Sequence, residues 1–209
     1  MYLYSTRRHL NPAHARKAVA HAIEAGQRAA TISGLDISVW TTVMSADAGL
    51  ITWTTMVEHL ADLEMAMDKL AVDGPWGDFV EQNDGLFVGA RTDTLAQMVS
   101  GPLDPTAPRP AYASVVQATC ANGHVAAGMA GGVEIAEAAT RIGGITTTFL
   151  ASSTGEYGGV AWITGAPDLA TLEAAEGKVN NDAGFLALAD RVSPAYLPHA
   201  SNTMHRRIS

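Results

Sequence analysis

Two stretches of the chain share one pattern of residues. Residues 49–55 read Gly-Leu-Ile-Thr-Trp-Thr-Thr, and residues 158–164 read Gly-Gly-Val-Ala-Trp-Ile-Thr. Each stretch is soon followed by a segment of the form Leu-Ala-x-Leu-Glu, at 60–64 in the first copy and at 169–173 in the second. Matched positions lie 109 residues apart. The pattern predicts a tryptophan-bearing strand that leads into an amphipathic helix, and it predicts this unit twice.

The match between the two halves extends well beyond this pattern. Before the predicted hairpin the matched residues lie 110 positions apart, and the spacing falls to 109 because the second copy lacks one residue. The pairs at the larger spacing are Tyr2 and Tyr112, His14 and His124, Glu24 and Glu134, and Gly34 and Gly144. Near the ends of the halves, Ser100 matches Ser209. We interpret this steady register as an internal duplication.

A proline-rich segment separates the two halves. Between residues 101 and 111 the chain carries Pro102, Pro105, Pro108 and Pro110. Prolines at this density do not continue a helix or a central strand, and they make a linker semi-rigid. We therefore predict a first repeat at 1–100, a linker at 101–111 and a second repeat at 112–209.

Each half is predicted to contain the element order β-α-β-β-α-β. In the first half the predicted segments are a strand at 1–9, a helix at 12–31, a strand at 35–43, the Trp53 strand, a helix at 59–72 and a strand at 95–99. This order is the ferredoxin-like unit. Helices on one face of such a sheet leave the other face uncovered, and two copies solve this by packing sheet against sheet. The expected fold class is α+β, with two ferredoxin-like repeats fused into one chain and their sheets packed face to face as an α+β barrel.

These features resemble the dimeric α+β-barrel superfamily, in the form where two repeats are fused in one chain. The resemblance rests on the element order in both halves, on the size of the repeat and on the tryptophan-bearing strand followed by a helix. It covers almost the whole chain outside the linker. Members of this superfamily include cofactor-free monooxygenases of antibiotic biosynthesis, heme-degrading enzymes, chlorite-dismutase-like heme proteins, EthD and NIPSNAP-type proteins, and stress-responsive barrels.

The two tryptophans invite a comparison with the heme-degrading relatives. Those relatives place a tryptophan of the third strand over the cofactor, with an Asn on the first strand and a His on the second helix. This chain matches only the tryptophans, Trp53 and Trp162. The position ten residues beyond each is a leucine, Leu63 or Leu172. We therefore expect no cofactor, disfavour heme, and expect both tryptophans to pack between sheet and helix.

The composition limits the classes of partner. The formal net charge is −8, and the only basic clusters are the pairs at 7–8 and 206–207, so we expect no nucleic-acid partner. The sequence lacks a run of about 18 apolar residues and the apolar core of a signal peptide, so we expect no membrane insertion. The single cysteine, Cys120, fits a reducing compartment. We expect a cytoplasmic protein.

Two histidines occupy matched positions near the start of the first helix of each half. His14 and His124 could each act as a general base at the mouth of a pocket, or could be exposed or capping residues. No carboxylate or third ligand near them has metal-binding spacing, so we predict no metal site.

Three glycines lie in the apolar helix that is predicted at 125–140. Gly128, Gly131 and Gly132 each lower the stability of that helix, by about 1 kcal/mol. We interpret them as room for the close approach of another helix, such as one of a second chain, or for a ligand between helix and sheet.

The favoured function is the binding of a small, largely apolar molecule in a pocket between sheet and helices, where the resemblance places such pockets. Chemistry there would be cofactor-independent, of the monooxygenase or isomerase type, and the sequence leaves open whether the chain is an enzyme. The residues expected to line two such pockets are Tyr4, His14, Trp40 and Trp53 in the first half and Tyr112, His124, Phe149 and Trp162 in the second. The alternative is a non-catalytic assembly protein that forms a homo-oligomer or docks on a partner.

Overall fold

The structure divides the chain into two compact units. This computed structural model describes residues 1–101 and 109–209. Unit 1 comprises Met1–Leu95 and Arg207–Ser209, and unit 2 comprises Ala96–Arg206. Because no placement of one unit against the other is defined, each unit is described by itself.

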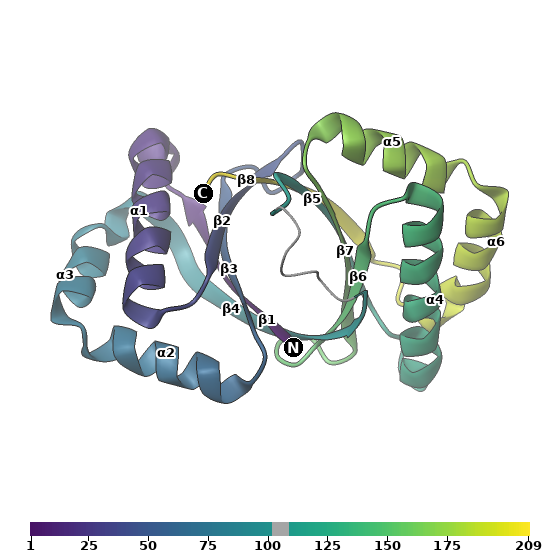
Figure 1. The fold of residues 1–209 in the computed structure, drawn as a ribbon, viewed down its shortest axis with the longest axis horizontal. Helices are drawn as coiled ribbons and strands as arrows, with labels where there is room; N and C mark the ends of the chain where they lie inside the picture. The colour runs from purple at the N-terminus through teal and green to yellow at the C-terminus, as the bar shows by residue number, and fades with distance from the viewer. Residues whose placement is uncertain (102–108) are drawn as a thin grey trace. The chain divides into compact units, whose positions relative to one another are not determined.

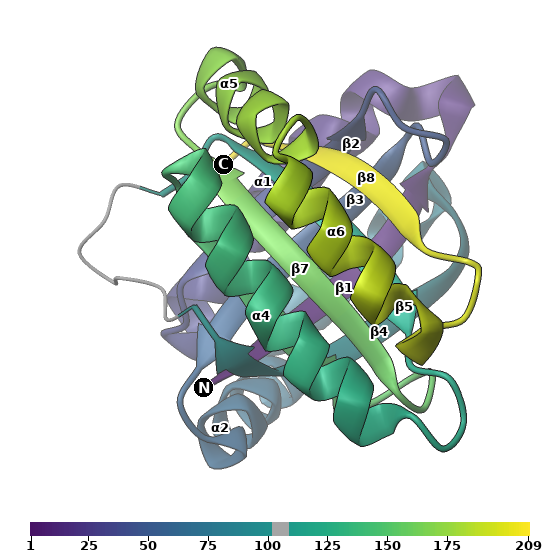
Figure 2. The same cartoon turned by 90° about the vertical axis from the view of Figure 1, so that its right-hand side faces the viewer.

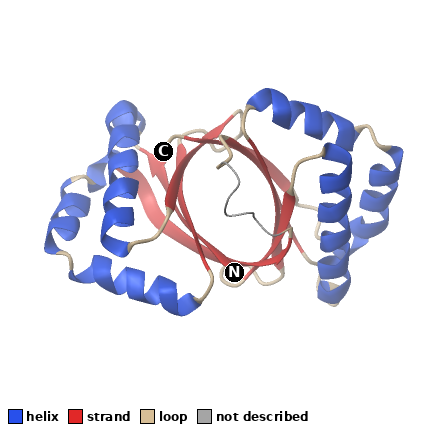
Figure 3. Cartoon of the chain, viewed as in Figure 1, coloured by secondary structure: helices blue, strands red, loops and turns tan. Residues whose placement is uncertain are grey.

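Unit 1 is a sheet with helices on one of its faces (Figures 1 and 3). Its strands pair antiparallel in the order β1–β3–β2. In chain order its elements are β1 (Tyr2–Leu10), a 3-10 helix (Pro12–His14), α1 (Ala15–Ser33), β2 (Ile37–Val43), β3 (Leu50–Val57), α2 (Leu60–Val72), α3 (Gly74–Gln82), a second 3-10 helix (Asp84–Leu86) and β4 (Phe87–Ser100), whose last residues belong to unit 2.

Unit 2 repeats this arrangement. Its strands pair antiparallel in the order β8–β5–β7–β6–β4. Figure 2 shows helices α4, α5 and α6 on one side of strand β7. In chain order the elements are β5 (Tyr112–Thr119), α4 (Val125–Gly143), β6 (Thr147–Ser152), β7 (Gly159–Ala166), α5 (Leu169–Asn180), α6 (Ala183–Val192), a 3-10 helix (Ser193–Ala195) and β8 (Ser201–Arg207).

The ends of the units differ from the ends of the repeats. The last part of β4, from Ala96 to Ser100, pairs with β6 and so belongs to unit 2. At the other end, Ile208 donates its backbone N–H to the carbonyl oxygen of Val39 and belongs to unit 1. The predicted linker at 101–111 falls mostly on residues 102–108, which lie outside the described residues.

The fourth strand of the first repeat is longer than the five residues predicted at 95–99. It begins at Phe87 and passes through Gly89, which adopts a φ of 73°. Glycine tolerates this left-handed backbone without steric cost, so the glycine-rich passage forms an irregular strand rather than a loop.

Two helix ends are built the same way in both repeats, which supports the interpretation of a duplication. Gly34 ends α1 and Gly144 ends α4, both with a φ of 80° and with the N–H bonded to a carbonyl of the last turn. Asp73 and Asp182 precede α3 and α6, and each carboxylate accepts a 2.8 Å hydrogen bond from a backbone N–H of the first turn. The predicted α+β class and the two ferredoxin-like repeats are confirmed.

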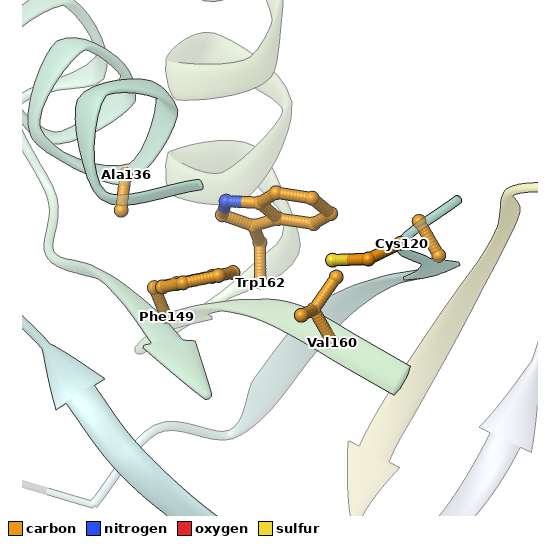
Figure 4. Packing of buried hydrophobic residues seen from close by; sticks show 6 residues of the cluster. Cys120, Ala136, Phe149, Val160 and Trp162 are labelled. Atoms are coloured by element: carbon orange, nitrogen blue, oxygen red, sulfur yellow. The ribbon is translucent and has the colours of Figure 1, made fainter. Parts of the chain in front are cut away.

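Each tryptophan joins its strand to the first helix of its repeat. Trp53 Nε1 donates a 2.9 Å hydrogen bond to the carbonyl oxygen of Ala22, and Trp162 Nε1 donates one of the same length to Gly132. Figure 4 shows the Trp162 ring above β7, with its nitrogen toward the helix that carries Ala136. The prediction that both rings pack between sheet and helix is confirmed.

The space beneath each helix is filled by a different combination of side chains. In unit 1, the helix carries Ala22 and the sheet beneath it carries Val39. Val39 leaves no room for a side chain at Gly26, because a Cβ there would lie 2.6 Å from Val39 Cγ2. In unit 2 the matched residues are Gly132 and Phe149, and a Cβ on Gly132 would overlap the Phe149 ring. A larger sheet residue therefore accompanies a smaller helix residue.

Neighbours within unit 2 account for all three predicted glycines of α4. A Cβ on Gly128 would lie 2.6 Å from Cys120 Sγ, and one on Gly131 would overlap Val192. Together with the Phe149 ring at Gly132, these contacts replace the second chain or ligand that the sequence suggested. The glycines bring α4 close to its own sheet and to α6.

A stack of rings covers α1 in unit 1. His21 lies with its ring centroid 4.4 Å from that of Phe79 and 5.9 Å from that of Phe87. The Arg28 guanidinium also lies over the Phe79 ring, 4.1 Å from its centroid. Burial lowers the pKa of His21; Glu24 acts in the opposite direction, whereas the nearby arginines lower it further.

The fit between Gly132 and Phe149 gives a first prediction. Gly132→Ala should destabilise unit 2 by about 1–3 kcal/mol through overpacking, even though Ala favours a helix by about 1 kcal/mol over Gly. Phe149→Leu removes the ring atoms that a new Cβ would meet. In chemical denaturation, the double variant should therefore lose less stability than the two single losses added together. Strict additivity would contradict the packing argument.

The lowered pKa of His21 gives a second prediction. The folded state resists protonation of His21, whereas the unfolded state accepts a proton near pH 6.5. His21 therefore contributes stability that is present above this pH and is lost as the pH falls below it. We expect His21→Leu to lose less stability than the parent protein between pH 7 and pH 5, measured by denaturation at each pH. His199→Leu, at an exposed histidine, serves as the control, and identical pH profiles for the parent and His21→Leu would contradict the argument.

Candidate functional site

Two of the four residues predicted in the first repeat share one face of their sheet. Thr6 lies opposite Trp53 and Tyr4 lies opposite Thr55 in the pairing of β1 with β3. Opposite residues of paired strands point to the same side, and Trp53 reaches α1, so Tyr4 and Trp53 are diagonal neighbours on the helix-covered side. Both side chains are half-buried.

The other two lie elsewhere in unit 1. Trp40 is opposite Thr52, one residue out of step with Trp53, so it lies on the face away from the helices. Its Nε1 donates a 2.9 Å hydrogen bond to Thr54 Oγ1. His14 ends the 3-10 helix before α1 and is exposed.

In unit 2 the structure again brings two of the four residues together. Phe149 and Trp162 are opposite each other on β6 and β7, with ring centroids 5.2 Å apart. Tyr112 lies on the same face of the sheet. It is four residues along β5 from Val116, the residue opposite Trp162, and four strand residues span about 13 Å. His124 is exposed just before α4. The assignment of all eight residues to ligand binding stays a prediction.

The space around Trp162 is occupied by side chains and does not fit a heme. Phe149 is fully buried beside the indole, and the Tyr196 ring lies edge-on to it with centroids 5.5 Å apart. Leu172, at the position where the heme-degrading pattern has a histidine, is fully buried. The Tyr196 hydroxyl donates a hydrogen bond to the carbonyl oxygen of Gly128, and no flat macrocycle can enter beside the indole without expelling these side chains.

Tyr4 belongs to a short chain of hydrogen bonds in unit 1. Thr6 Oγ1 lies 3.1 Å from the Tyr4 hydroxyl and 2.8 Å from Asp93 Oδ1. Since a threonine has one hydroxyl proton and a carboxylate only accepts, Tyr4 donates to Thr6 and Thr6 donates to Asp93. Burial raises the pKa of Tyr4 above its ordinary value. The chain holds the phenol in its neutral form.

Thr55 beside Tyr4 is a buried hydroxyl for which the described residues provide no partner. In unit 2 the matched Thr164 shares a 2.9 Å hydrogen bond with Thr147, and the residue that matches Thr147 in unit 1 is Ile37. The apolar Ile37 therefore removes the partner, and a water molecule can satisfy the hydroxyl.

A groove of about 370 Å³ lies in unit 2 between α4 and α6, and we call it the α4–α6 groove. Its floor and walls consist of small or apolar residues. On the α4 side these are Ala127, Ala130 and Gly131, and on the side of α6 and the following 3-10 helix they are Val192, Pro194 and Ala195. The close contact of Gly131 with Val192 brings the two walls together.

Three polar side chains edge the same groove. They are His124 at the start of α4, Glu134 two to three turns further along the helix, and Arg191 in the last turn of α6. Arg191 Nη2 forms an ion pair with Glu134 Oε2. Both charged side chains remain about half exposed or more, at 61% for Arg191 and 49% for Glu134, so solvent screens their attraction.

The matching surface of unit 1 has different contents. The residue that matches Gly131 is His21, and its ring stacks on Phe79 of α3. Arg28 covers the same phenylalanine. Rings and a guanidinium therefore occupy this region in unit 1, whereas in unit 2 Val192 lies against Gly131.

A smaller hollow of about 260 Å³ lies on the other side of the start of α4. Val125 and Met129 of the helix line it together with the turn between β6 and β7, from Ala151 to Gly159. Tyr157 in this turn is 84% exposed. The hollow contains backbone and hydroxyl groups but only one ionisable carboxylate, Glu156.

The sequence identified one residue of the α4–α6 groove as a site residue, His124. Gly131 was singled out only as one of three helix glycines that make room for another helix or a ligand, and Ala130 and Arg191 were not identified. The pairing of Glu134 with Arg191 joins residues 57 positions apart. The one available hint was that the residue matching Arg191 in the first repeat is Gln82, so this charge is new in the second repeat.

In the ranges 1–101 and 109–209, no three His, Cys, Asp or Glu side chains come together as a metal site. No helix in the described part of the chain combines the length and the apolarity needed to cross a bilayer.

Comparison with known proteins finds likeness in structure alone. No protein-family model and no curated protein sequence matches the chain significantly. A proposed monooxygenase from Fusobacterium nucleatum has a TM-score of 0.72 at 6% identity, covering 100% of this chain and 92% of that one. A proposed monooxygenase from Lactobacillus acidophilus scores 0.66 at 6% identity, covering 100% and 94%. An anthrone oxidase-like protein scores 0.60 at 10% identity, covering 100% and 91%.

These likenesses extend over the full length of both partners in each comparison. At identities of 6–10% they report on the fold and not on the reaction. The chain has an α+β fold of two fused ferredoxin-like repeats, and these solved structures share it.

Proposed function

We propose that the chain binds a small, largely apolar molecule, and that it does so in the α4–α6 groove of unit 2. The observation that carries the proposal is an apolar floor lined also by polar side chains, His124 at the start of α4 and the pair of Glu134 and Arg191 further along the groove. Ligand sites in proteins are mostly apolar hollows of about 300–1,000 Å³ with a few polar groups that orient the ligand. A groove of about 370 Å³ is at the lower end of this range and suits a molecule of one to three rings.

The structural neighbours support a small organic molecule as the class of ligand. Three of them are named as proposed monooxygenases or as anthrone oxidase-like, and all three have the same fold over their full length. Names of this kind describe reactions on small organic molecules. The location in unit 2 rests on the groove itself and not on these neighbours.

We further propose that chemistry in this groove begins with proton transfer to His124. An imidazole titrates nearest to neutral pH and can take a proton from an activated CH₂ group, leaving a carbanion. Return of the proton at another carbon would be an isomerisation. Reaction of the carbanion with dioxygen, which is then the oxidant, converts CH₂ and O₂ into a carbonyl group and water.

Binding in the groove is tested by filling it. Ala130→Leu places a larger side chain in the groove at an exposed helical position, and we expect at least a tenfold weaker affinity for 1-naphthylmethanol. Ala126→Leu is the matched control, because Ala126 is exposed on the same helix but does not line the groove. Binding is measured by the fluorescence of the naphthyl group. Equal affinities of the two variants, or no binding by the parent protein, would exclude this site.

The chemistry is tested with anthrone, whose CH₂ group is acidified by the adjacent ring carbonyl. We expect the protein to consume one dioxygen for each anthrone converted into anthraquinone and water, as followed by an oxygen electrode. His124→Gln should lower the rate at least tenfold because the proton acceptor is lost, whereas His199→Gln, at an exposed histidine outside the groove, should retain it. An unchanged rate in His124→Gln would show that His124 is not the base.

A further inference from the structure

We infer that the ligand of the α4–α6 groove is an apolar carboxylic acid whose carboxylate binds Arg191. This inference rests on the proposed function, because it concerns the same groove. It adds the chemical class of the ligand and a specific role for the ion pair between Arg191 and Glu134.

Arg191 is placed where the polar end of a groove ligand must lie. Arg191 lies in the last turn of α6, next to Val192, and Val192 forms part of the apolar wall of the groove. A guanidinium has five N–H donors in a planar fork that matches both oxygens of a carboxylate. The ion pair with Glu134 engages Nη2 of this fork. An acid with its rings on Ala130 and Gly131 can therefore direct its carboxylate to the same cation.

Comparison of the repeats shows that this cation is particular to the open groove. Glu24 matches Glu134, but it pairs with Arg28 of its own helix, with 2.5 Å between Arg28 Nη2 and Glu24 Oε1. The residue that matches Arg191 is Gln82. Unit 1 therefore has His21 where unit 2 has Gly131, and Gln82 where unit 2 has a cation on the opposite helix.

Glu134 is the competitor that the ligand must displace. An exposed ion pair between Arg and Glu is worth little, because water screens it and ordering the two side chains costs entropy. A ligand carboxylate that is held at the groove by its apolar rings gains the same attraction without that separate ordering. Glu134 therefore keeps Arg191 over the groove when it is empty and yields Arg191 when an acid binds.

The experiment compares two probes that share one apolar body, 1-naphthoate and 1-naphthylmethanol, at pH 7 and low ionic strength. We expect the full-length protein to bind the naphthoate about three to ten times more tightly. Arg191→Gln should abolish this preference, so that the variant binds the naphthoate and the alcohol with equal affinity. Glu134→Gln should strengthen naphthoate binding about threefold, because a competing carboxylate is removed while the side-chain shape is kept.

The outcomes separate this inference from the proposed function. If neither probe binds the parent protein, the groove is not a ligand site and both proposals fail. If both probes bind equally, the groove is a site but the inference of an acid is wrong. Weaker naphthoate binding by Glu134→Gln would show that Glu134 only positions Arg191, and it would overturn the competitor role. A circular dichroism spectrum and an unfolding midpoint for each variant, compared with the parent protein, show that it is folded.

Discussion

The hydrogen bond from a strand tryptophan to a helix carbonyl sets the geometry of both units. It joins Trp53 to Ala22 and Trp162 to Gly132 at 2.9 Å, so it fixes the height and rotation of α1 and α4 above their sheets. A buried indole N–H without an acceptor costs about 1–3 kcal/mol, which makes this distance hard to relax. The residue under the helix must then fit the space that remains. Val39 with Gly26, and Phe149 with Gly132, are two solutions to that one constraint.

Much of this could be predicted from the sequence, because it depends on local order and on repetition. The spacing of the matched residues gave the two repeats, and the strand and helix patterns gave the ferredoxin-like order. The role of Trp162 followed from a large ring that lies between a strand and a helix. For the glycines of α4 the sequence suggested the close approach of another helix, which Val192 of α6 provides, but it did not identify the neighbours. These are Val192, Cys120 and Phe149, which approach the helix only in the folded chain.

The candidate site could be predicted only in part, for the same physical reason. His124 was identifiable because its match with His14 drew attention to the start of a helix. The groove is made by the distance between α4 and α6, and no periodicity within either helix encodes that distance. The pair of Glu134 and Arg191 spans 57 positions, and comparison of the repeats shows only that Gln82 stands in the place of Arg191, not that Arg191 reaches Glu134.

The two repeats show how a duplicated scaffold can hold different chemistry. The helix caps and the tryptophan bonds, which set the positions of the elements, are the same in both. The residues that fill the remaining space differ, as with His21 and Gly131 or Ile37 and Thr147. A floor of Ala, Gly and Pro attracts a ligand through buried area alone and gives it no preferred orientation. Orientation, and with it any selectivity, must therefore come from the polar edge that only the second repeat possesses.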